Sequence, residues 1–434
     1  MTKRNENRQE YKKTKVGWIP ETWSSTELKD VIVNGISNGV FNDPKKVGAG
    51  YKLINVIDLY SEPYIDIDSC KLLDIHENEF KRNQVLQGDI FFTRSSLKLE
   101  GIAHCNINLS NYNNVTFDGH VMKISPNKKL VDPLYLRLYC LTNRARRYFM
   151  QNAKQTTMTT IGQSEISKLP IPIPPLAEQK KIAQILSAWD RAIEQTRKLI
   201  EAKKRLKKGL MQQLLFGRIR FNEFQNSEGI QSTPFYEYPK DWTHPRIGEI
   251  ANEVIDRNIY NKEVTVLSCS KYEGFVSSLE YFGKKIYSDD TSSYKIIKRW
   301  QFGFPANHVE EGSIGLLDHL EQGIVSPIYI IFQTEPGKVY PPFLYSLLKT
   351  NIFKHIFRVN TSASVDRRGS LRWKDFRRIR VPLPKITEQK VISSLLDKSE
   401  REIEMHELKL ELIQKQKKGL MQKLLTGEIR VKVS

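Results

Sequence analysis

Two stretches of the chain carry apolar residues at the spacing of a paired helix. Stepping alternately by four and three residues from Ile182 to Leu214 meets ten positions, of which seven are apolar. The same steps from Ile392 to Leu424 again meet seven apolar residues in ten. This heptad pattern is typical of helices that pack along a common seam. The predicted interface residues are Ile182, Leu186, Trp189, Ile193, Ile200, Leu210, Leu214, Ile392, Leu396, Ile403, Leu410, Ile413, Leu420 and Leu424.

Both stretches lie in an internal repeat that is gapless at an offset of 210 residues. PIPPLAEQKKIAQIL at Pro172–Leu186 corresponds to PLPKITEQKVISSLL at Pro382–Leu396, and KKGLMQQLLFGRIR at Lys207–Arg220 to KKGLMQKLLTGEIR at Lys417–Arg430. In each copy, prolines before the block, a glutamate in the first turn and a glycine after the last turn predict one long helix. A helix of about 40 residues is about 60 Å long, so we expect the two seams to pair with each other.

Polar residues and glycines interrupt this pattern. Lys203 and Lys207 lie on the first seam, which indicates that their ammonium groups reach water or meet acidic partners. Gly209 and Gly419 lie inside the helices, where glycine costs about 1 kcal/mol relative to alanine. Close approach of another helix and a kink both explain them. A single such stripe fits a core-facing helix equally well, but the gapless repeat favours a helix pair.

The two segments before the repeats share a mixed pattern of strands and helices. In the first, a β-rich run, a turn with a strand, and a helix are predicted at Tyr51–Tyr60, Gln87–Ser96 and Pro133–Phe149. The second has the same order at Ser292–Leu317, Ile324–Phe332 and Pro341–Phe357. Each segment also opens with a proline three residues before a tryptophan. The predicted fold class is α+β, with two mixed α/β domains separated by two long helices.

The charge of the chain indicates a polyanionic partner. Lysine and arginine number 68 against 49 aspartate and glutamate, for a formal net charge of +19. This excess favours nucleic acid, with an anionic membrane surface as the alternative. No apolar run approaches the roughly 20 residues that span a bilayer, and the basic N-terminal stretch lacks the apolar region of a signal peptide. We therefore expect a cytoplasmic protein.

No pattern in the sequence indicates catalysis or a metal site. Cys70, Cys105, Cys140 and Cys269 are widely spaced and fit reduced, structural thiols. Phosphate-binding loops, zinc-protease motifs and nucleophile elbows are absent from the sequence. Tyr340–Phe343 (YPPF) is similar to a loop of amino-methyltransferases, but tyrosine cannot hold the target amine, so a helix start is the better interpretation. We expect no catalytic residue, no metal and no cofactor bound by this chain.

Several motifs together resemble the DNA-specificity subunit of type I restriction-modification enzymes. They are the doubled P-x-P-x-x-x-E-Q-K block with its trailing helix, GDIFFTRSS at Gly88–Ser96, EGSIGLLDHLEQGIVSP at Glu311–Pro327, and SVDRRGSLRWKDFRRIRVPLP at Ser364–Pro384. The resemblance covers about Val16 to Arg430. One departure is FPANHV, where His308 replaces the basic residue of an Asn-Pro-Ala-Arg-like stretch.

This resemblance implies two target-recognition domains and two spacer helices that pack as an antiparallel coiled coil. The expected organisation is a basic flexible leader at 1–15, a first target-recognition domain at 16–170, a central repeat at 171–221, a linker at 222–234, a second target-recognition domain at 235–380 and a C-terminal repeat at 381–434. Each domain would read one half-site of a bipartite, asymmetric target in double-stranded DNA, with half-sites about one helical turn apart.

The resemblance also implies the partners. Two methyltransferase subunits would bind S-adenosylmethionine and methylate an adenine in each half-site, which requires base flipping. Restriction and translocation subunits would use ATP and Mg²⁺. The chain itself would be a non-catalytic scaffold that selects the site.

Candidate DNA contacts lie in loops with hydroxyl and basic side chains. Arginine favours guanine O6 and N7, and hydroxyls and arginines bind phosphates; a solvated, charged loop is the alternative interpretation. The candidates are Arg94, Ser95, Ser96, Lys98, Thr156, Thr157, Thr159, Thr160, Asn307, His308, Thr361, Ser362, Ser364, Arg367, Arg368 and Arg372.

Two other classes of protein stay open on the residues alone. A coiled-coil protein that binds nucleic acid without specificity would show steep salt dependence and no sequence preference. A self-contained methyltransferase and nuclease would be active as an isolated chain. The divergent domains disfavour the first class, and the missing catalytic motifs disfavour the second.

Overall fold

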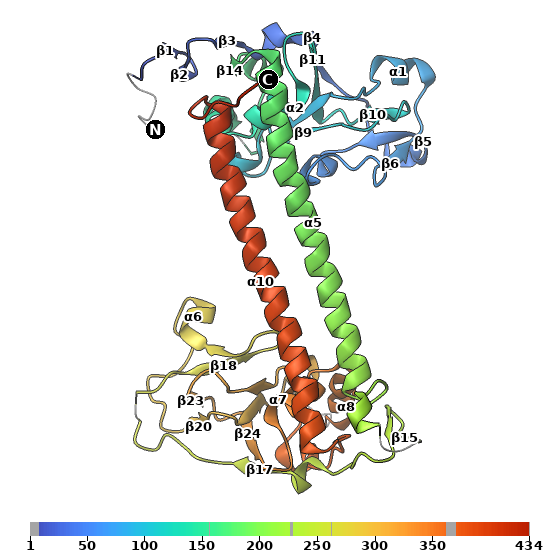
Figure 1. Cartoon of the computed structure of the whole chain (residues 1–434), viewed down its shortest axis with the longest axis vertical. Helices are drawn as coiled ribbons and strands as arrows, with labels where there is room; N and C mark the ends of the chain where they lie inside the picture. Colours follow the sequence, from blue (N-terminus) through green and yellow to red (C-terminus); the bar gives the residue numbers. More distant parts are fainter. Residues whose placement is uncertain (1–7, 156, 226–228, 262, 362–369, 434) are drawn as a thin grey trace. The chain divides into compact units, whose positions relative to one another are not determined.

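The computed structural model describes residues 8–155, 157–225, 229–261, 263–361 and 370–433. Two compact units are resolved within it. The first unit contains the described residues of Met1–Leu199 and Glu407–Ser434, and the second contains those of Ile200–His406. Each unit therefore includes one end of both repeat helices, together with one of the mixed segments (Figure 1).

The two predicted long helices are confirmed. They are α5 (Leu176–Leu214) and α10 (Ile386–Leu425), and each is continuous. Both end before a glycine with positive φ, Gly217 at 66° and Gly427 at 72°, as expected for a left-handed C-terminal residue. A Cβ on Gly209 or Gly419 would meet no atom within 4 Å. Close approach of another helix therefore does not explain these two glycines.

In both units α5 and α10 run antiparallel, as the ion pairs between them show. In the first unit Lys417 contacts Asp190. In the second unit Lys203 Nζ lies 2.6 Å from Glu402 Oε1, and Lys207 contacts Glu400. The partner number falls as the α5 number rises, which defines the antiparallel direction. Lys203 and Lys207 therefore meet acidic partners, which is one of the two predicted alternatives.

The main sheet of the first unit is antiparallel, in the order β4-β11-β7-β9. β7 is buried along its whole length, as its sequence IFFT requires. The strands of this sheet are β4 (Ile32–Asn38), β7 (Ile90–Thr93), β9 (Cys105–Ile107) and β11 (Val121–Pro126). The other strands of the unit are β1 (Tyr11–Thr14), β2 (Gly17–Pro20), β3 (Ser24–Glu27), β5 (Val47–Ile54), β6 (Lys71–Leu73), β8 (Ser95–Ser96), β10 (Val115–Phe117), β12 (Lys154–Gln155), β13 (Thr159–Thr160) and β14 (Pro170–Ile173).

The second unit repeats this sheet, in the order β17-β24-β21-β22. The strands are β17 (Ala251–Val254), β21 (Phe302–Pro305), β22 (Gly315–Leu316) and β24 (Tyr329–Thr334). Three further two-stranded antiparallel pairs complete the unit: β15 (Ile230–Ser232) with β16 (Glu237–Pro239), β18 (Leu267–Ser270) with β19 (Gly274–Ser277), and β20 (Lys295–Lys298) with β23 (Gln322–Val325). The prediction that both segments share a fold is consistent with this common strand order.

Short helices cover the sheets and close the cores. Those of the first unit are α1 (Glu77–Arg82), α2 (Pro133–Cys140), α3 (Asn143–Asn152) and α4 (Gln163–Ser167). Those of the second are α6 (Ser278–Phe282), α7 (Pro341–Leu348), α8 (Asn351–Asn360) and α9 (Trp373–Phe376). The ends of the long helices enter both cores: Ile182 and Leu186 join the first, and Ile392 and Leu396 join the second.

Three predicted elements are divided in the structure. The helices expected at Pro133–Phe149 and Pro341–Phe357 are each two helices, because Thr142 and Thr350 act as N-caps that accept hydrogen bonds from the Ala145 and Phe353 amides. The strand expected at Ile324–Phe332 is also two, since Pro327 lacks the N–H that a continuous strand needs. The helix start predicted at YPPF is confirmed, because α7 begins at Pro341.

Candidate nucleic-acid interface

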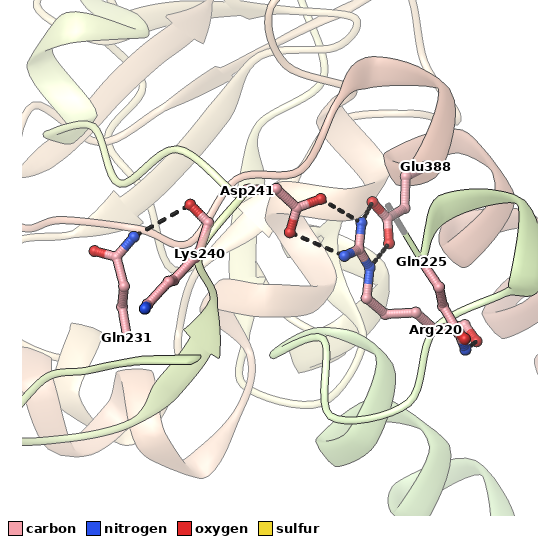
Figure 2. A network of polar contacts seen from close by, with 6 residues as sticks. All are labelled: Arg220, Gln225, Gln231, Lys240, Asp241 and Glu388. Atoms are coloured by element: carbon pink, nitrogen blue, oxygen red, sulfur yellow. Dashed lines mark hydrogen bonds and ion pairs between the residues drawn. The ribbon is translucent and has the colours of Figure 1, made fainter. Parts of the chain in front are cut away.

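A buried glutamate anchors the start of each long helix. In the second unit Glu388 accepts hydrogen bonds from Arg220 Nε at 2.8 Å and Nη2 at 2.9 Å. The same guanidinium donates to both carboxylate oxygens of Asp241 at 2.9 Å, so it lies between two acids (Figure 2). These contacts raise the pKa of Arg220, chiefly through its hydrogen bond to Glu388. We call Arg220, Glu388 and Asp241 the second clasp.

The first unit has the corresponding clasp, made of Glu178, Arg430 and Trp23. Arg430 donates to Glu178 through Nε at 2.6 Å and Nη2 at 2.8 Å, and Trp23 Nε1 donates to the same carboxylate at 3.0 Å. In the second unit the equivalent indole nitrogen of Trp242 is buried and has no acceptor within the described chain. The two clasps therefore satisfy their glutamates with different donors.

The glutamine after each glutamate holds the preceding loop. Gln179 accepts a hydrogen bond from the Asp132 amide at 2.8 Å and donates to the carbonyl oxygens of Leu130 and Pro174. Gln389 does the same with the Tyr340 amide at 2.7 Å and with the carbonyl oxygens of Lys338 and Pro384. The Glu-Gln pair of the repeat is thus structural, because it joins each long helix to the domain before it.

The structure brings two predicted contact clusters of the first unit together. Antiparallel pairing of β8 with β13 places Ser95 opposite Thr160 and Ser96 opposite Thr159. The Ile161 amide donates to the Arg94 carbonyl oxygen at 3.1 Å, which continues this pairing. These paired residues are 65 and 63 positions apart in sequence, and their strands form one surface. Ser95 and Ser96 are half-buried and Thr160 is exposed, whereas Thr159 is buried and is the least available to a ligand.

The flanking candidates of the first unit are exposed. Arg94, Lys98 and Thr157 all lie on the surface. The Lys98 amide donates to Ser96 Oγ at 3.2 Å, which fixes the turn after β8. Thr156 lies outside the described residues.

In the second unit, Asn307 and Arg372 line one pocket of about 990 Å³. The Leu371 amide donates to the Ala306 carbonyl oxygen at 2.8 Å, and this bond joins the two parts of the pocket wall. It is the counterpart of the bond between Ile161 and Arg94. Sequence reasoning missed other residues of this wall, although the run RWKDFRR was a visible signal. They are Arg246, Trp373, Lys374, Arg377 and Arg378.

The remaining candidates of the second unit lie elsewhere. His308 is exposed, and its Nδ1 lies 3.6 Å from Glu311 Oε1. Thr361 follows α8 and donates through Oγ1 to the Phe357 carbonyl oxygen at 2.8 Å, so its hydroxyl hydrogen is used within the helix end. Ser362, Ser364, Arg367 and Arg368 lie outside the described residues.

A smaller pocket, of about 400 Å³, lies in the first unit between the loop after η4 (Ile57–Tyr60), α2 and the helix pair. His104 stacks on Tyr60 there, with ring centroids 4.5 Å apart. Burial lowers the pKa of His104, and nearby Arg146 and Arg137 lower it further. Arg137 is itself buried and donates to the carbonyl oxygen of Pro63 at 2.9 Å.

All fourteen predicted seam residues are buried or half-buried. The half-buried ones are Trp189, Leu210, Leu410, Ile413 and Leu420, and the other nine are buried. By contrast, Leu206, Leu408 and Leu412 are exposed by half or more of their surface. The exposure pattern is thus consistent with the predicted seam, whose side-chain contacts stay a prediction.

The four cysteines are free and none is near a metal-ligand cluster within the described chain. Burial raises the pKa of Cys70 and of Cys269 to about 12. No helix among the described residues is both long and apolar enough to cross a membrane.

Comparison with known proteins identifies the family. A sequence model described as the type I restriction modification DNA specificity domain matches residues 20–204. A chain from Methanocaldococcus jannaschii, assigned as the type I restriction enzyme MjaX specificity subunit, is 30% identical over 442 residues that cover 97% of both chains. This chain belongs to the type I restriction-modification specificity subunits. Members of this family recognise the DNA target and are non-catalytic components of the restriction-modification complex.

Other relatives agree with this specificity-subunit assignment. The MjaVIII specificity subunit of M. jannaschii is 28% identical over 72% of this chain and 74% of its own length. The crystal structure of the type I restriction-modification S subunit from M. genitalium matches with a TM-score of 0.53 at 14% identity, covering 93% of this chain and 96% of that one. At this identity the structural match supports the fold, which confirms the predicted class of two mixed domains and long helices.

Proposed function

We propose that this specificity subunit reads a split, asymmetric target in double-stranded DNA, one half-site with each unit. The observation that carries the proposal is one sheet order, β4-β11-β7-β9 and β17-β24-β21-β22, with different side chains at equivalent positions. Arg94, Ser95 and Ser96 follow β7, whereas Ala306, Asn307 and His308 follow β21. A common frame with different donors and acceptors suits two different base sequences.

The repeat supports a role as an assembly scaffold. Equivalent clasps and equivalent helix starts offer two similar surfaces, which suit two copies of one methyltransferase subunit. In this proposal those subunits hold S-adenosylmethionine and flip and methylate an adenine in each half-site. Restriction subunits that use ATP and Mg²⁺ complete the enzyme, and the complex works in the cytoplasm, where its DNA is. The target-recognition domains span 16–170 and 235–380.

The competing function is a coiled-coil protein that binds nucleic acid without sequence preference. It accounts for the charge of +19 and the long helices. It gives no reason for two domains with the same sheet and different loops. The family assignment also favours specificity over non-specific binding.

Methylation mapping tests the proposal directly. The chain is co-expressed with its cognate methyltransferase subunit, and methylated adenines are mapped across a host genome by single-molecule sequencing. We expect one bipartite motif. Replacing residues 16–170 with the same domain of a relative should change one half of the motif only, and replacing 235–380 should change the other half only.

A substitution outside the proposed interface, such as Lys284→Ala, serves as the control and should leave the motif unchanged. A complex that assembles but methylates no consistent motif would contradict the proposal and support the non-specific binder. A motif that changes in both halves after one exchange would contradict the assignment of one half-site to each unit.

A further inference from the structure

Cationic side chains from α9 and its two ends line the large pocket of the second unit. Arg372, Lys374, Arg377 and Arg378 lie along α9 and its two ends, line the pocket and are all exposed. None of these four forms an ion pair within the part of the chain that the structure describes. A cluster of cations that form no ion pairs attracts anions, and the low-dielectric walls of a pocket strengthen that attraction.

The acidic residues of the pocket come from elements other than α9. Glu249 belongs to η7 (Ile247–Glu249), where its side chain accepts a hydrogen bond from the Arg246 amide at 2.9 Å, and Glu253 lies on β17. The Gly248 amide, next to Glu249, donates to the Arg377 carbonyl oxygen at 2.9 Å, so η7 adjoins the end of α9. With Arg246, the pocket lining has five cationic side chains against two carboxylates, which favours an anion. Trp373, which stacks on Phe332 with centroids 5.6 Å apart, supports the α9 wall from the core side.

The corresponding wall of the first unit is nearly neutral. The matching backbone bonds, Leu371 to Ala306 and Ile161 to Arg94, align α9 with α4 at the repeat offset. At this alignment the first unit has Gly162, Ser164, Ser167 and Lys168 in place of the four cationic residues.

The adjacent strands of the first unit carry hydroxyls together with separate cations. Ser95, Ser96 and Thr160 can bond to phosphates or base edges without releasing counterions. Arg94, Lys98 and Lys154, the last paired with Thr160, add exposed positive charge nearby. The two units therefore differ at the aligned helix, where three cations of the second unit replace uncharged residues of the first.

We infer that the α9 wall is a phosphate anchor, and that the second unit supplies more of the salt-dependent affinity for DNA than the first. This inference rests on the proposed function. Guanidinium groups bind phosphate oxygens in bidentate geometry and release condensed counterions, whereas hydroxyls bind without this release. At the aligned helices α9 and α4, the half-site of the second unit is held by charge and that of the first by neutral hydrogen bonds.

A salt series on the full chain tests the anchor. Affinity for a 30-bp duplex is measured against KCl concentration for the natural chain and for R372S/K374S/R377S, which makes these three positions uncharged, as they are in the first unit. Each phosphate contact contributes about 0.9 to the slope of log affinity against log salt. We expect the slope to become shallower by about 2 to 3. The control K240S/K284S/K385S removes the same charge from exposed positions outside the pocket and should change the slope by less than about 1.

A second variant adds positive charge to the first unit, so that the proposal can still be tested if the first variant folds poorly. S164K/S167R in the first unit should make the slope steeper by about 1 to 2. A slope unchanged by both variants, or lowered equally by the control, would overturn the anchor. If the natural chain yields a bipartite methylation motif but the variants have the same salt slope as the natural chain, this inference alone is overturned. A chain that yields no motif would overturn the proposed function instead.

Discussion

The guanidinium of Arg430 binds the buried carboxylate of Glu178 although 252 positions separate the two residues. Its counterpart Arg220 binds Glu388 in the same way, but the two arginines differ in exposure. The side chain of Arg220 is 9% exposed and that of Arg430 is 41% exposed. Both glutamate side chains are 3% exposed, so the difference lies in the arginines: water can replace part of the contact that Arg430 makes more easily than the contact that Arg220 makes.

Arg220→Ala should consequently destabilise the protein more than Arg430→Ala. Removing Arg220 leaves a buried carboxylate without its cation, which costs about 3 to 5 kcal/mol. Arg430→Ala should cost about 1 to 2 kcal/mol, because Trp23 still donates to Glu178 and water reaches the site. Urea unfolding followed by tryptophan fluorescence measures both. The exposed Arg218→Ala is the control, and equal costs for the two clasp variants would contradict this account.

The two equivalent tryptophans should respond differently to replacement by phenylalanine. Trp23→Phe removes a hydrogen bond to a buried carboxylate, whereas Trp242→Phe removes an indole N–H that has no acceptor among the described residues. We expect Trp23→Phe to lower the free energy of unfolding by about 1.5 to 3 kcal/mol more than Trp242→Phe. Chemical denaturation of the two variants makes the comparison. A larger cost for Trp242→Phe would refute it.

The helix seam can be tested with one pair of leucines on α5. Leu186 is fully buried in the first core, while Leu206 is 56% exposed. Leu186→Ala should lower the free energy of unfolding by about 2 to 5 kcal/mol, because it leaves a cavity. Leu206→Ala should change it by about 0.5 kcal/mol or less. Similar effects from both substitutions would contradict the predicted seam.

Stability should decrease as the pH falls below about 6.5, in part because two histidines are kept neutral. Burial lowers the pKa of His104 and of His244, and neighbouring arginines add to the effect. The unfolded chain takes up protons near the ordinary pKa of 6.5, where the folded chain does not. Acid therefore favours the unfolded state. Stability above pH 7 should be unaffected by this pair.

The measurement is urea unfolding at pH 7.5 and pH 5.5. His104→Gln and His244→Gln should each reduce the difference in unfolding free energy between the two pH values. The exposed His319→Gln is the matched control and should leave the difference unchanged. If neither His104→Gln nor His244→Gln reduced it, other groups would account for the acid sensitivity.

Local signals were sufficient to predict the long helices but not the division of shorter elements. Prolines, first-turn glutamates and Gly217 and Gly427 mark the ends of α5 and α10 directly in the sequence. Thr142 and Thr350 are equally visible in the sequence as possible N-caps, but the predicted helices run through both of them. The apolar run at β23 and β24 likewise concealed the break at Pro327.

The candidate interface depended on contacts that a sequence does not display. The pairing of Ser95 with Thr160, and the bond from Leu371 to Ala306, join residues more than 60 positions apart. The sequence does not show the roles of Arg220 and Arg430 for the same reason. Both residues end a repeated Gly-x-Ile-Arg run, whose glycine is the one that terminates the long helix. Periodicity reports which face of an element is buried, but it does not name the partner.

The clasp of the first unit sets an order for folding on the ribosome. Glu178 and Trp23 are synthesised early, but Arg430 and the Gly427 carbonyl oxygen that accepts from Tyr11 come last. Synthesis of the first unit therefore begins before that of the second. It is completed only after all residues of the second unit, Ile200–His406, have been made. A premature stop after residue 406 would leave the second unit with its full set of contacts and deprive the first of its closing arginine.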